Sequence, residues 1–404
     1  MVSQFVSAGS QIYVAGVFLK PMTEDLGWNR AEFTYGQTLG RFVMAGIGLF
    51  IGTLVDRGHA RSMMLAGTTV LGIGLWLTSV VSELWQFVLL RGAVVTTGAA
   101  LIGNLVVNVT LSKWWVQKRG RMVGIASMGV SAAGVVLPPI MTALVDRFGW
   151  RAGWQVLAVL ALLATYPAAL LMRSRPEDSG LNPDGHSDEE MASALGDAAR
   201  ADYLASLTRG QALRTVAFYQ IVVAFGFATI GLGTMLFTTI PFTTDAGFNR
   251  SSGALMLSVL ALPAALSKPV WGLWMDRFPP KALAATSFAI AAIATIVVVL
   301  AAQAQHLPWL AVGFALVGWG LGGQIPIQEV IWASYFGRRH LGAVRSVAMP
   351  FALFFGAGGP LVVQYYHDRV GDYTGAFYGI AALWLLAGLL VLPVRAPRLV
   401  AIQP

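Results

Sequence analysis

The stretch GTLVDR at residues 52–57 ends a long apolar run, and GLWMDR at residues 272–277 ends another in the same way. Upstream of them, GWNR at residues 27–30 is repeated as GFNR at residues 247–250 with the same separation. Two further pairs keep nearly this separation: WWVQKR at 114–119 with YFGRRH at 335–340, and DRFG at 146–149 with DRVG at 368–371. Self-similarity at a fixed period is typical of a repeated structural unit, so the sequence predicts two copies of one unit.

The composition indicates whether this repeated unit lies in water or in a membrane. The 404 residues are 56% hydrophobic and only 11% charged, whereas soluble domains carry about 25% charged residues. A polytopic membrane protein is therefore predicted. Cysteine is absent from the sequence, which excludes a disulfide framework, a thiolate metal site and a cysteine nucleophile.

Apolar runs of about 20 residues, long enough to cross about 30 Å of hydrocarbon, predict an all-α membrane protein with 12 transmembrane helices. The helices are expected near residues 2–19, 31–54, 63–81, 84–111, 122–145, 152–172, 215–240, 251–275, 282–302, 308–335, 344–366 and 373–394. They form two predicted six-helix bundles, at residues 1–172 and 215–394. The polar segment 173–214 is interpreted as a cytoplasmic linker, and residues 395–404 as a cytoplasmic tail.

The distribution of charge predicts the topology. Most Lys and Arg residues fall in the loops after even-numbered helices, in the linker and in the tail. By the positive-inside rule both termini are cytoplasmic, in an inner or plasma membrane. The net charge of +8 then reflects topology and contact with anionic lipid, which argues against nucleic-acid binding. The first helix begins at Met1 without a basic flank, which favours a truncated or misassigned start over a signal peptide.

The residues around the first Asp-Arg pair resemble a known family. They are Gly52, Leu54, Asp56, Arg57, Gly58 and Arg61, with a weaker repeat at Gly272, Asp276, Arg277 and Lys281. This pattern is similar to the loop motif between helices 2 and 3 of the major facilitator superfamily, which implies a transporter whose halves rock about a substrate near the midplane. Three stretches resemble bacterial monocarboxylate porters related to oxalate and lactate carriers: RPEDSGLNPDG at 175–185, YFGRRHLGAVRS at 335–346 and DYTGAF at 372–377.

We interpret the two Asp-Arg loops as a conformational latch; the alternative for Asp56 and Arg57 is a solvated loop that only sets the membrane topology. A glycine one turn before the acid lets helices 2 and 11 approach closely, and the carboxylate can face a helix N-terminus or a neighbouring arginine. The predicted latch residues are Gly52, Asp56, Arg57 and Arg61 in the first half and Gly272, Asp276 and Arg277 in the second.

Two cations inside predicted helices point to an anionic substrate. Lys268 lies about 12 Å along its helix from the nearest Asp-Arg loop, and Arg41 about 22 Å, at 1.5 Å per residue. A charge at a helix centre costs about 2.5–3.5 kcal/mol, so its retention indicates a use. We interpret Lys268 as a substrate-anion site, with a structural ion pair or partial snorkelling as alternatives. Arg41 contacts either the substrate or Glu329.

The family resemblance bears on Lys268 as well. SKP at residues 267–269 aligns with an Ala-Arg-Pro stretch of the family, whose basic residue binds the substrate carboxylate. Lysine departs from that pattern because it offers a point charge instead of a bidentate fork. Ala264 stands where the animal members carry an acid. Tyr13 aligns with their helix-1 lysine and is a candidate substrate contact, so proton coupling of the animal type is not implied.

The remaining polar residues inside predicted helices keep two interpretations each. Glu329 either carries a coupled proton or neutralises Lys268 or Arg41. Arg91 has a structural or a coupling role, of which we favour the structural one. Two amide pairs, each on one helix face at i, i+4, either line the cavity or form interhelical hydrogen bonds: Asn104 with Asn108, and Gln324 with Gln328.

The sequence contains no nucleotide-binding fingerprint, and its five histidines are not at metal-ligand spacing. We therefore predict a protein that is not an enzyme, requires neither cofactor nor metal and uses a gradient. The predicted function is secondary transport of a small organic anion, a monocarboxylate, by alternating access with proton symport. Anion exchange, and export of drugs or other small molecules, are the alternatives. The predicted partners are the substrate, protons and lipid, and the predicted state is a monomer.

Overall fold

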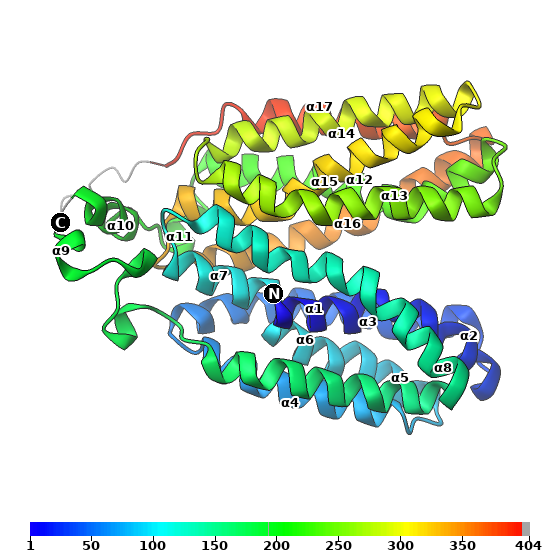
Figure 1. The fold of residues 1–404 in the computed structure, drawn as a ribbon, viewed down its shortest axis with the longest axis horizontal. Coiled ribbons are helices and arrows are strands. Elements are labelled where there is room, and N and C mark those ends of the chain that lie inside the picture. Colours follow the sequence, from blue (N-terminus) through cyan, green and yellow to red (C-terminus); the bar gives the residue numbers. More distant parts are fainter. Residues whose placement is uncertain (193, 398–404) are drawn as a thin grey trace. The chain divides into compact units, whose positions relative to one another are not determined.

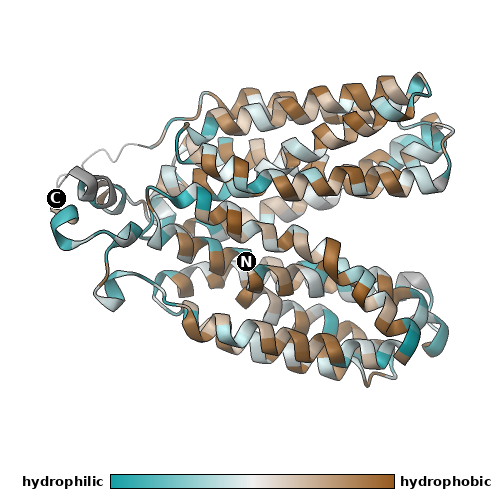
Figure 2. Ribbon diagram, in the orientation of Figure 1, coloured by the Kyte–Doolittle hydropathy of each residue, from teal (hydrophilic) through white to brown (hydrophobic). Residues whose placement is uncertain are grey.

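The computed structural model describes residues 1–192 and 194–397, and within them all regular structure is helical (Figure 1). Hydrophobic residues follow the long helices, and hydrophilic ones gather at their ends and connections (Figure 2). Ten of the described helices are long and apolar enough to cross a membrane, or 11 if one bent pair is counted as a single span. The prediction of an all-α membrane fold is confirmed.

The first span is longer than predicted and is bent. It consists of α1 (Val2–Ala8), a π-helical turn η1 (Gly9–Tyr13) and α2 (Ala15–Leu26), with a bend of 43°. The sequence predicts its end near residue 19, because Lys20 begins a polar stretch. The helix nevertheless continues to Gly27, whose φ of 70° is the left-handed conformation that suits glycine at a helix end.

The next three spans follow the predicted runs, two of them with small extensions and α4 shifted toward the N-terminus by three residues. They are α3 (Arg30–Asp56), α4 (Ala60–Thr78) and an interrupted span from Leu84 to Trp114. The interrupted span contains α5 (Leu84–Leu89), the π-helical turn η2 (Leu90–Val95), α6 (Thr96–Ile102) and α7 (Asn104–Trp114). Its extended residue Gly103 separates α6 from α7.

Helix α8 (Arg119–Leu171) is a single element of 53 residues that contains a break. A straight helix of this length would measure about 80 Å at 1.5 Å per residue, far more than the hydrocarbon thickness. Gly149 has a φ of 80° and a ψ of 165°, which interrupts the helix and divides it into two arms. With the arms counted separately, the described spans match the 12 predicted ones.

The segment predicted as a linker contains short helices. They are η3 (Glu177–Ser179), η4 (Pro183–Gly185), α9 (Asp188–Met191), α10 (Ala194–Leu204) and α11 (Arg209–Ala212). The six spans that follow are α12 (Val216–Asp245), α13 (Arg250–Met275), α14 (Pro280–Gln303), α15 (Leu307–Phe336), α16 (Leu341–Val370) and α17 (Thr374–Val391). Of the predicted tail, residues 398–404 lie outside the described residues.

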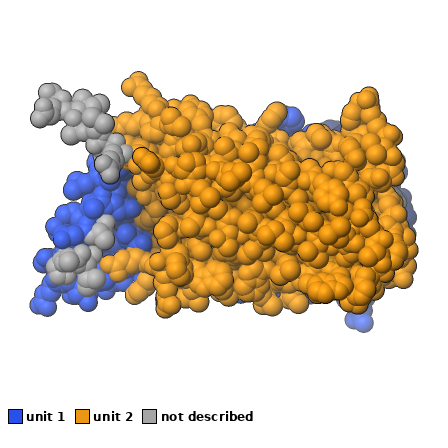
Figure 3. Space-filling view, turned by 90° about the horizontal axis from the view of Figure 1, so that it is seen from above, with its two compact units in different colours: residues 1–116, 125–206, 338–349 blue, residues 117–124, 207–337, 350–404 orange. Residues whose placement is uncertain are grey.

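The chain forms two compact units, coloured separately in Figure 3. Unit 1 contains residues 1–116, 125–206 and 338–349, and unit 2 contains the rest of the described chain. The first residues of α16 therefore group with the first half of the sequence, and those of α8 with the second half. These two helix starts are where both Asp-Arg loops make their contacts.

Candidate functional site

Asp56 lies at the centre of a buried polar cluster within unit 1. Its carboxylate accepts hydrogen bonds from the backbone N–H groups of Gly342, at 3.1 Å, and Ala343, at 2.7 Å. The ammonium of Lys113 lies 2.8 Å from the same carboxylate. The side chains of Asp56 and Lys113 are only 8% and 3% exposed. We call Asp56, Lys113, Gly342 and Ala343 the Asp56 cluster.

The geometry of this cluster follows from helix chemistry. Gly342 and Ala343 belong to the first turn of α16, where backbone N–H groups have no partner inside the helix. The helix dipole adds partial positive charge there, so a carboxylate is a favourable partner. Asp56, the last residue of α3, thus joins two segments that are far apart in the sequence.

Gly52 lies one turn before Asp56 and allows the two helices to meet. A Cβ atom at this position would collide with the backbone carbonyl of Gly342, which cannot move aside as a flexible side chain can. The close approach predicted for this glycine is therefore present in unit 1.

We expect Gly52→Ala to lower the melting temperature by several degrees and to weaken the contact between α3 and α16, because the added methyl group requires a backbone shift. The matched control is Gly46→Ala on the same helix, where an added Cβ meets no atom within 4 Å. This control should be neutral or slightly stabilising, since alanine favours helix. Equal melting temperatures for the two variants in a thermal unfolding assay would contradict the steric argument.

The second Asp-Arg loop makes a related but more open contact within unit 2. Asp276 accepts a hydrogen bond from the backbone N–H of Arg121, at 3.3 Å, in the first turn of α8. Its partner cation is the Arg121 side chain itself, 3.6 Å away and 45% exposed. A Cβ on Gly272 would lie 2.8 Å from the Gly120 carbonyl oxygen. We call Asp276 and Arg121 the Asp276 cluster.

The three predicted latch cations do not join either cluster. The side chains of Arg57, Arg61 and Arg277 are exposed, and within residues 1–192 and 194–397 they form no ion pair or side-chain hydrogen bond. Lys113 and Arg121 provide the charge instead. Sequence reasoning missed Lys113 because the predicted helix ended at residue 111, which left this lysine among the loop cations.

The linker extends the Asp56 cluster. Arg175 donates a hydrogen bond to the backbone carbonyl of Asp56, and Arg338 donates one to the carbonyl of Lys113, at 3.0 Å. The Arg338 guanidinium also lies 2.8 Å from the Glu177 carboxylate and is only 7% exposed. Arg175 and Glu177 belong to the stretch RPEDSG, and Arg338 belongs to YFGRRH. The sequence singles out these two stretches only through their resemblance to monocarboxylate porters.

Lys268 is 3% exposed in the last third of α13, within unit 2. Its neighbours Ser267 and Trp271 both donate hydrogen bonds to the carbonyl of Trp319 in α15, at 3.2 and 2.9 Å, which fixes this part of α13 against α15. Lys268 itself takes part in a polar interaction within the described residues. A cation is thus held inside an apolar span.

Helix α15 carries the other candidates of this unit. Glu329 is 6% exposed, Gln328 is half-buried, and both have interaction partners. Gln324 is 5% exposed, and within the described residues neither its amide oxygen nor its nitrogen has a hydrogen-bond partner. An unsatisfied buried amide costs about 1–3 kcal/mol, which makes Gln324 a candidate for contact with a polar ligand.

The candidates of unit 1 have different surroundings. Arg41 is exposed on α3, and within the described residues it has no ion pair. Tyr13 is half-buried, and its ring lies against the position of Gly134. Asn104 begins α7 and is half-buried, whereas Asn108 is 1% exposed and accepts a hydrogen bond from the Gln4 amide, at 2.7 Å.

Arg91 has contacts that favour a structural role. It is 4% exposed and donates a hydrogen bond to the carbonyl of Ser10, at 2.9 Å. Its guanidinium also lies 5.2 Å from the centre of the Trp154 ring. Ser10 belongs to the π-helical turn η1, so Arg91 holds the bent first span against the interrupted fourth one.

Comparison with known proteins gives a consistent family. A sequence model of the Major Facilitator Superfamily matches residues 1–261 and 222–404. Human monocarboxylate transporter 11 is 26% identical over 351 residues, which cover 84% of this chain and 68% of that protein. The fujikurins efflux protein of Gibberella fujikuroi is 28% identical over 148 residues, which cover 37% of this chain and 32% of that protein. The chain therefore spans about a third of the length of that fungal relative.

Solved structures support the fold. The E. coli fucose:proton symporter FucP matches with a TM-score of 0.72 at 12% identity, over 96% of each chain. The human organic anion transporter MFSD10 matches with a TM-score of 0.69 at 15% identity, over 96% of this chain and 98% of that one. At such identities these matches establish the arrangement of helices and leave the substrate open.

Proposed function

Because the chain belongs to the major facilitator superfamily of membrane transporters, we propose that it carries a small organic anion, a monocarboxylate, by alternating access. The observation that carries this proposal is Lys268, which is buried at 3% exposure within a membrane span. A cation at such a position is costly, and a bound carboxylate would offset its charge. The exposed Arg41 on α3 is a second candidate for contact with the anion.

The likeness to human monocarboxylate transporter 11 supports the same substrate class. The likeness to a fungal efflux protein favours export of small molecules as the second candidate function. The two candidate functions differ in the charge that the binding site needs if the exported molecule is a cation. An exporter of cations needs acids in its site, whereas a carboxylate carrier needs bases. Membrane orientation with both termini cytoplasmic is part of the proposal and follows from the positive-inside rule.

The proposal is tested with purified protein in proteoliposomes. Uptake of a panel of labelled monocarboxylates and dicarboxylates is measured beside that of lipophilic cations, with and without a pH gradient. Saturable transport of monocarboxylates would support the proposal. Transport of the cations alone would overturn it in favour of export, and stimulation only by a carboxylate on the opposite side would replace symport by exchange.

Glu329 is the proposed proton carrier, since it is a buried carboxylate in a span that also contains Gln324 and Gln328. We expect Glu329→Gln to abolish uptake driven by a pH gradient and to retain substrate exchange, which needs no net proton movement. The two modes are measured in the same proteoliposomes. Glu329→Asp, which keeps an ionisable group, should retain part of the driven uptake. Undiminished driven uptake by Glu329→Gln would eliminate this residue as the carrier.

The Asp56 and Asp276 clusters are proposed as the two parts of the conformational latch. Each joins the end of one helix to the start of another from the opposite half of the sequence. Alternating access requires such contacts to form in one conformation and to break in another, so they set the balance between states. Their proposed role is to control the exchange between conformations and not to bind the substrate.

A further inference from the structure

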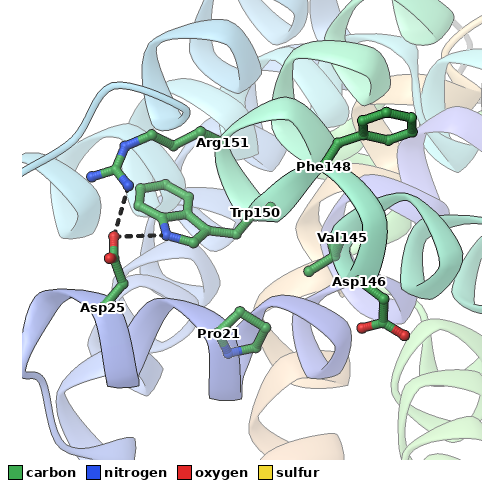
Figure 4. Close-up of a pocket in the computed structure, with 8 residues that line it drawn as sticks. Pro21, Asp25, Val145, Asp146, Phe148, Trp150 and Arg151 are labelled. Carbon is green, nitrogen blue, oxygen red and sulfur yellow. Dashed lines mark hydrogen bonds and ion pairs between the residues drawn. The ribbon is translucent and has the colours of Figure 1, made fainter.

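The repeated DRFG and DRVG stretches lie at the helix ends opposite to the two Asp-Arg loops, and the proposed transport does not use them. In unit 1, Asp25 near the end of α2 accepts hydrogen bonds from the Trp150 indole, at 3.0 Å, and the Arg151 guanidinium, at 2.7 Å (Figure 4). Arg151 also stacks on the Trp150 ring at 4.1 Å. This contact joins the end of α2 to the second arm of α8, just after Gly149.

The second half of the chain also pairs the corresponding carboxylate with a basic side chain, but from a different position. Asp245, the last residue of α12, corresponds to Asp25, because each lies two residues before a repeated glycine, Gly247 and Gly27. Its carboxylate contacts the His367 imidazole in the last turn of α16, with an Nε2–Oδ2 distance of 2.9 Å. His367 precedes the repeated DRVG stretch, whereas Arg151 follows DRFG, so the two halves pair this carboxylate with residues at different positions: a permanent cation in the first half and a titratable imidazole in the second.

The surroundings of His367 supply a carboxylate for each ring nitrogen. Nε2 faces Asp245 from α12, and Nδ1 lies 3.8 Å from the Asp368 carboxylate on α16. A neutral imidazole can donate through one nitrogen only, whereas the imidazolium donates through both. The position in the last turn of a helix also favours a cation through the helix dipole.

The remaining neighbours of His367 are an aromatic ring, an arginine and a further carboxylate. The Tyr373 ring, ahead of α17, stacks on the imidazole at 4.2 Å, and its hydroxyl donates to Gln364 at 3.0 Å. Burial raises the pKa of Tyr373; the hydrogen bond with Gln364 acts against this rise, and the nearby carboxylates add to it, so the phenol stays neutral at physiological pH. Arg369 lies over the Tyr365 ring at 4.5 Å, and the Asp372 carboxylate accepts from the Thr374 N–H.

We propose that His367, Asp245 and Asp368 form a proton-sensitive clasp between the ends of α12 and α16, whereas the Asp25–Arg151 contact in the other half is constitutive. Protonation of His367 gives the clasp a positive charge between two carboxylates, so acidification tightens it. The ends of these helices then open less often. This inference does not depend on the identity of the substrate or on Glu329.

The test is hydrogen exchange of the full-length protein in nanodiscs at pH 7.5 and 5.8, with rates corrected for intrinsic chemical exchange. In the wild type, amides of residues 243–248 and 367–374 should be about two- to fivefold better protected at the lower pH, as suits a partly exposed ion pair. His367→Gln should give low protection at both pH values. His367→Arg, which puts a permanent cation in place of the imidazole, should give high protection at both.

Two controls localise the effect. Asp245→Asn should remove the pH response while His367 is still present. Residues 22–28 and 147–152 in the other half should show no pH response, and Asp25→Asn should lower their protection equally at both pH values. The proposal is overturned if the wild type shows no response at residues 243–248, if His367→Gln retains it, or if both halves respond alike.

Discussion

Replacing Lys268 with glutamine is expected to weaken monocarboxylate binding by tenfold or more, which corresponds to about 1.4 kcal/mol. The reason is electrostatic, because the ammonium is the buried cation of α13 and glutamine keeps most of its length but not its charge. Lys268→Arg should retain part of the affinity, since charge is kept and shape is changed. The measurement is the Kd of labelled carboxylates for purified protein, by scintillation proximity or calorimetry.

Two controls separate loss of the site from loss of the fold. Thermal unfolding is recorded for every variant, and only variants that unfold near the wild-type temperature are interpreted. Arg214→Gln removes one positive charge from an exposed linker position and should leave the Kd within twofold of the wild type. If Lys268→Gln bound carboxylates normally, or lost binding only through unfolding, Lys268 would be a structural partner within unit 2.

Asp56→Asn is expected to reduce the transport rate by at least tenfold while substrate affinity stays within a few fold. The substitution leaves the Lys113 ammonium buried at 3% exposure without its counterion, a change that costs about 3–5 kcal/mol in comparable buried pairs. It also replaces a carboxylate at the start of α16 by an amide that interacts less well with the helix dipole. Initial uptake rates and Kd are measured on the same preparations.

The second half of the chain provides the matched control. Asp276→Asn removes the equivalent carboxylate, but its partner Arg121 is 45% exposed, so the lost interaction is worth about 0–1 kcal/mol. Its effect on transport should therefore be several-fold smaller. Combining Asp56→Asn with Lys113→Met should recover thermal stability, because no unpaired buried charge remains. Equal losses of transport rate in Asp56→Asn and Asp276→Asn would contradict the argument that burial of the ion pair sets the size of the effect.

The helices could be predicted because hydrocarbon imposes a simple rule on sequence: about 20 apolar residues for each crossing. The rule locates the spans but not their ends. Helix α2 continues from Lys20 to Leu26, and α7 continues to Trp114, because helices extend into the polar region where the apolar criterion no longer applies. The breaks at η1 and Gly103 also escaped prediction, since both lie in apolar runs.

A residue of the candidate site could be predicted where the residue itself is unusual in its stretch of sequence. Lys268 and Glu329 are conspicuous because charge is rare in apolar runs, and Asp56 because its loop is repeated. The partner of Asp56 was not predictable, because Lys113, 57 positions away in sequence, becomes a neighbour only through tertiary packing. The roles of these residues remain predictions until the variants are measured.

The contacts of the linker determine where this chain could be divided into two pieces. Ser174 donates to the carbonyl of Gly58, Asp184 accepts from the Val116 N–H, and Glu177 pairs with Arg338, all within unit 1. Leu207, which follows the last linker residue of unit 1, belongs to unit 2. Its backbone N–H donates to the carbonyl of Phe336 in the same unit. A split-protein version should therefore keep residues 173–206 with the first piece and begin the second at Leu207. Arg338 and the start of α16 would then supply the docking surface through which the separately made pieces reassociate.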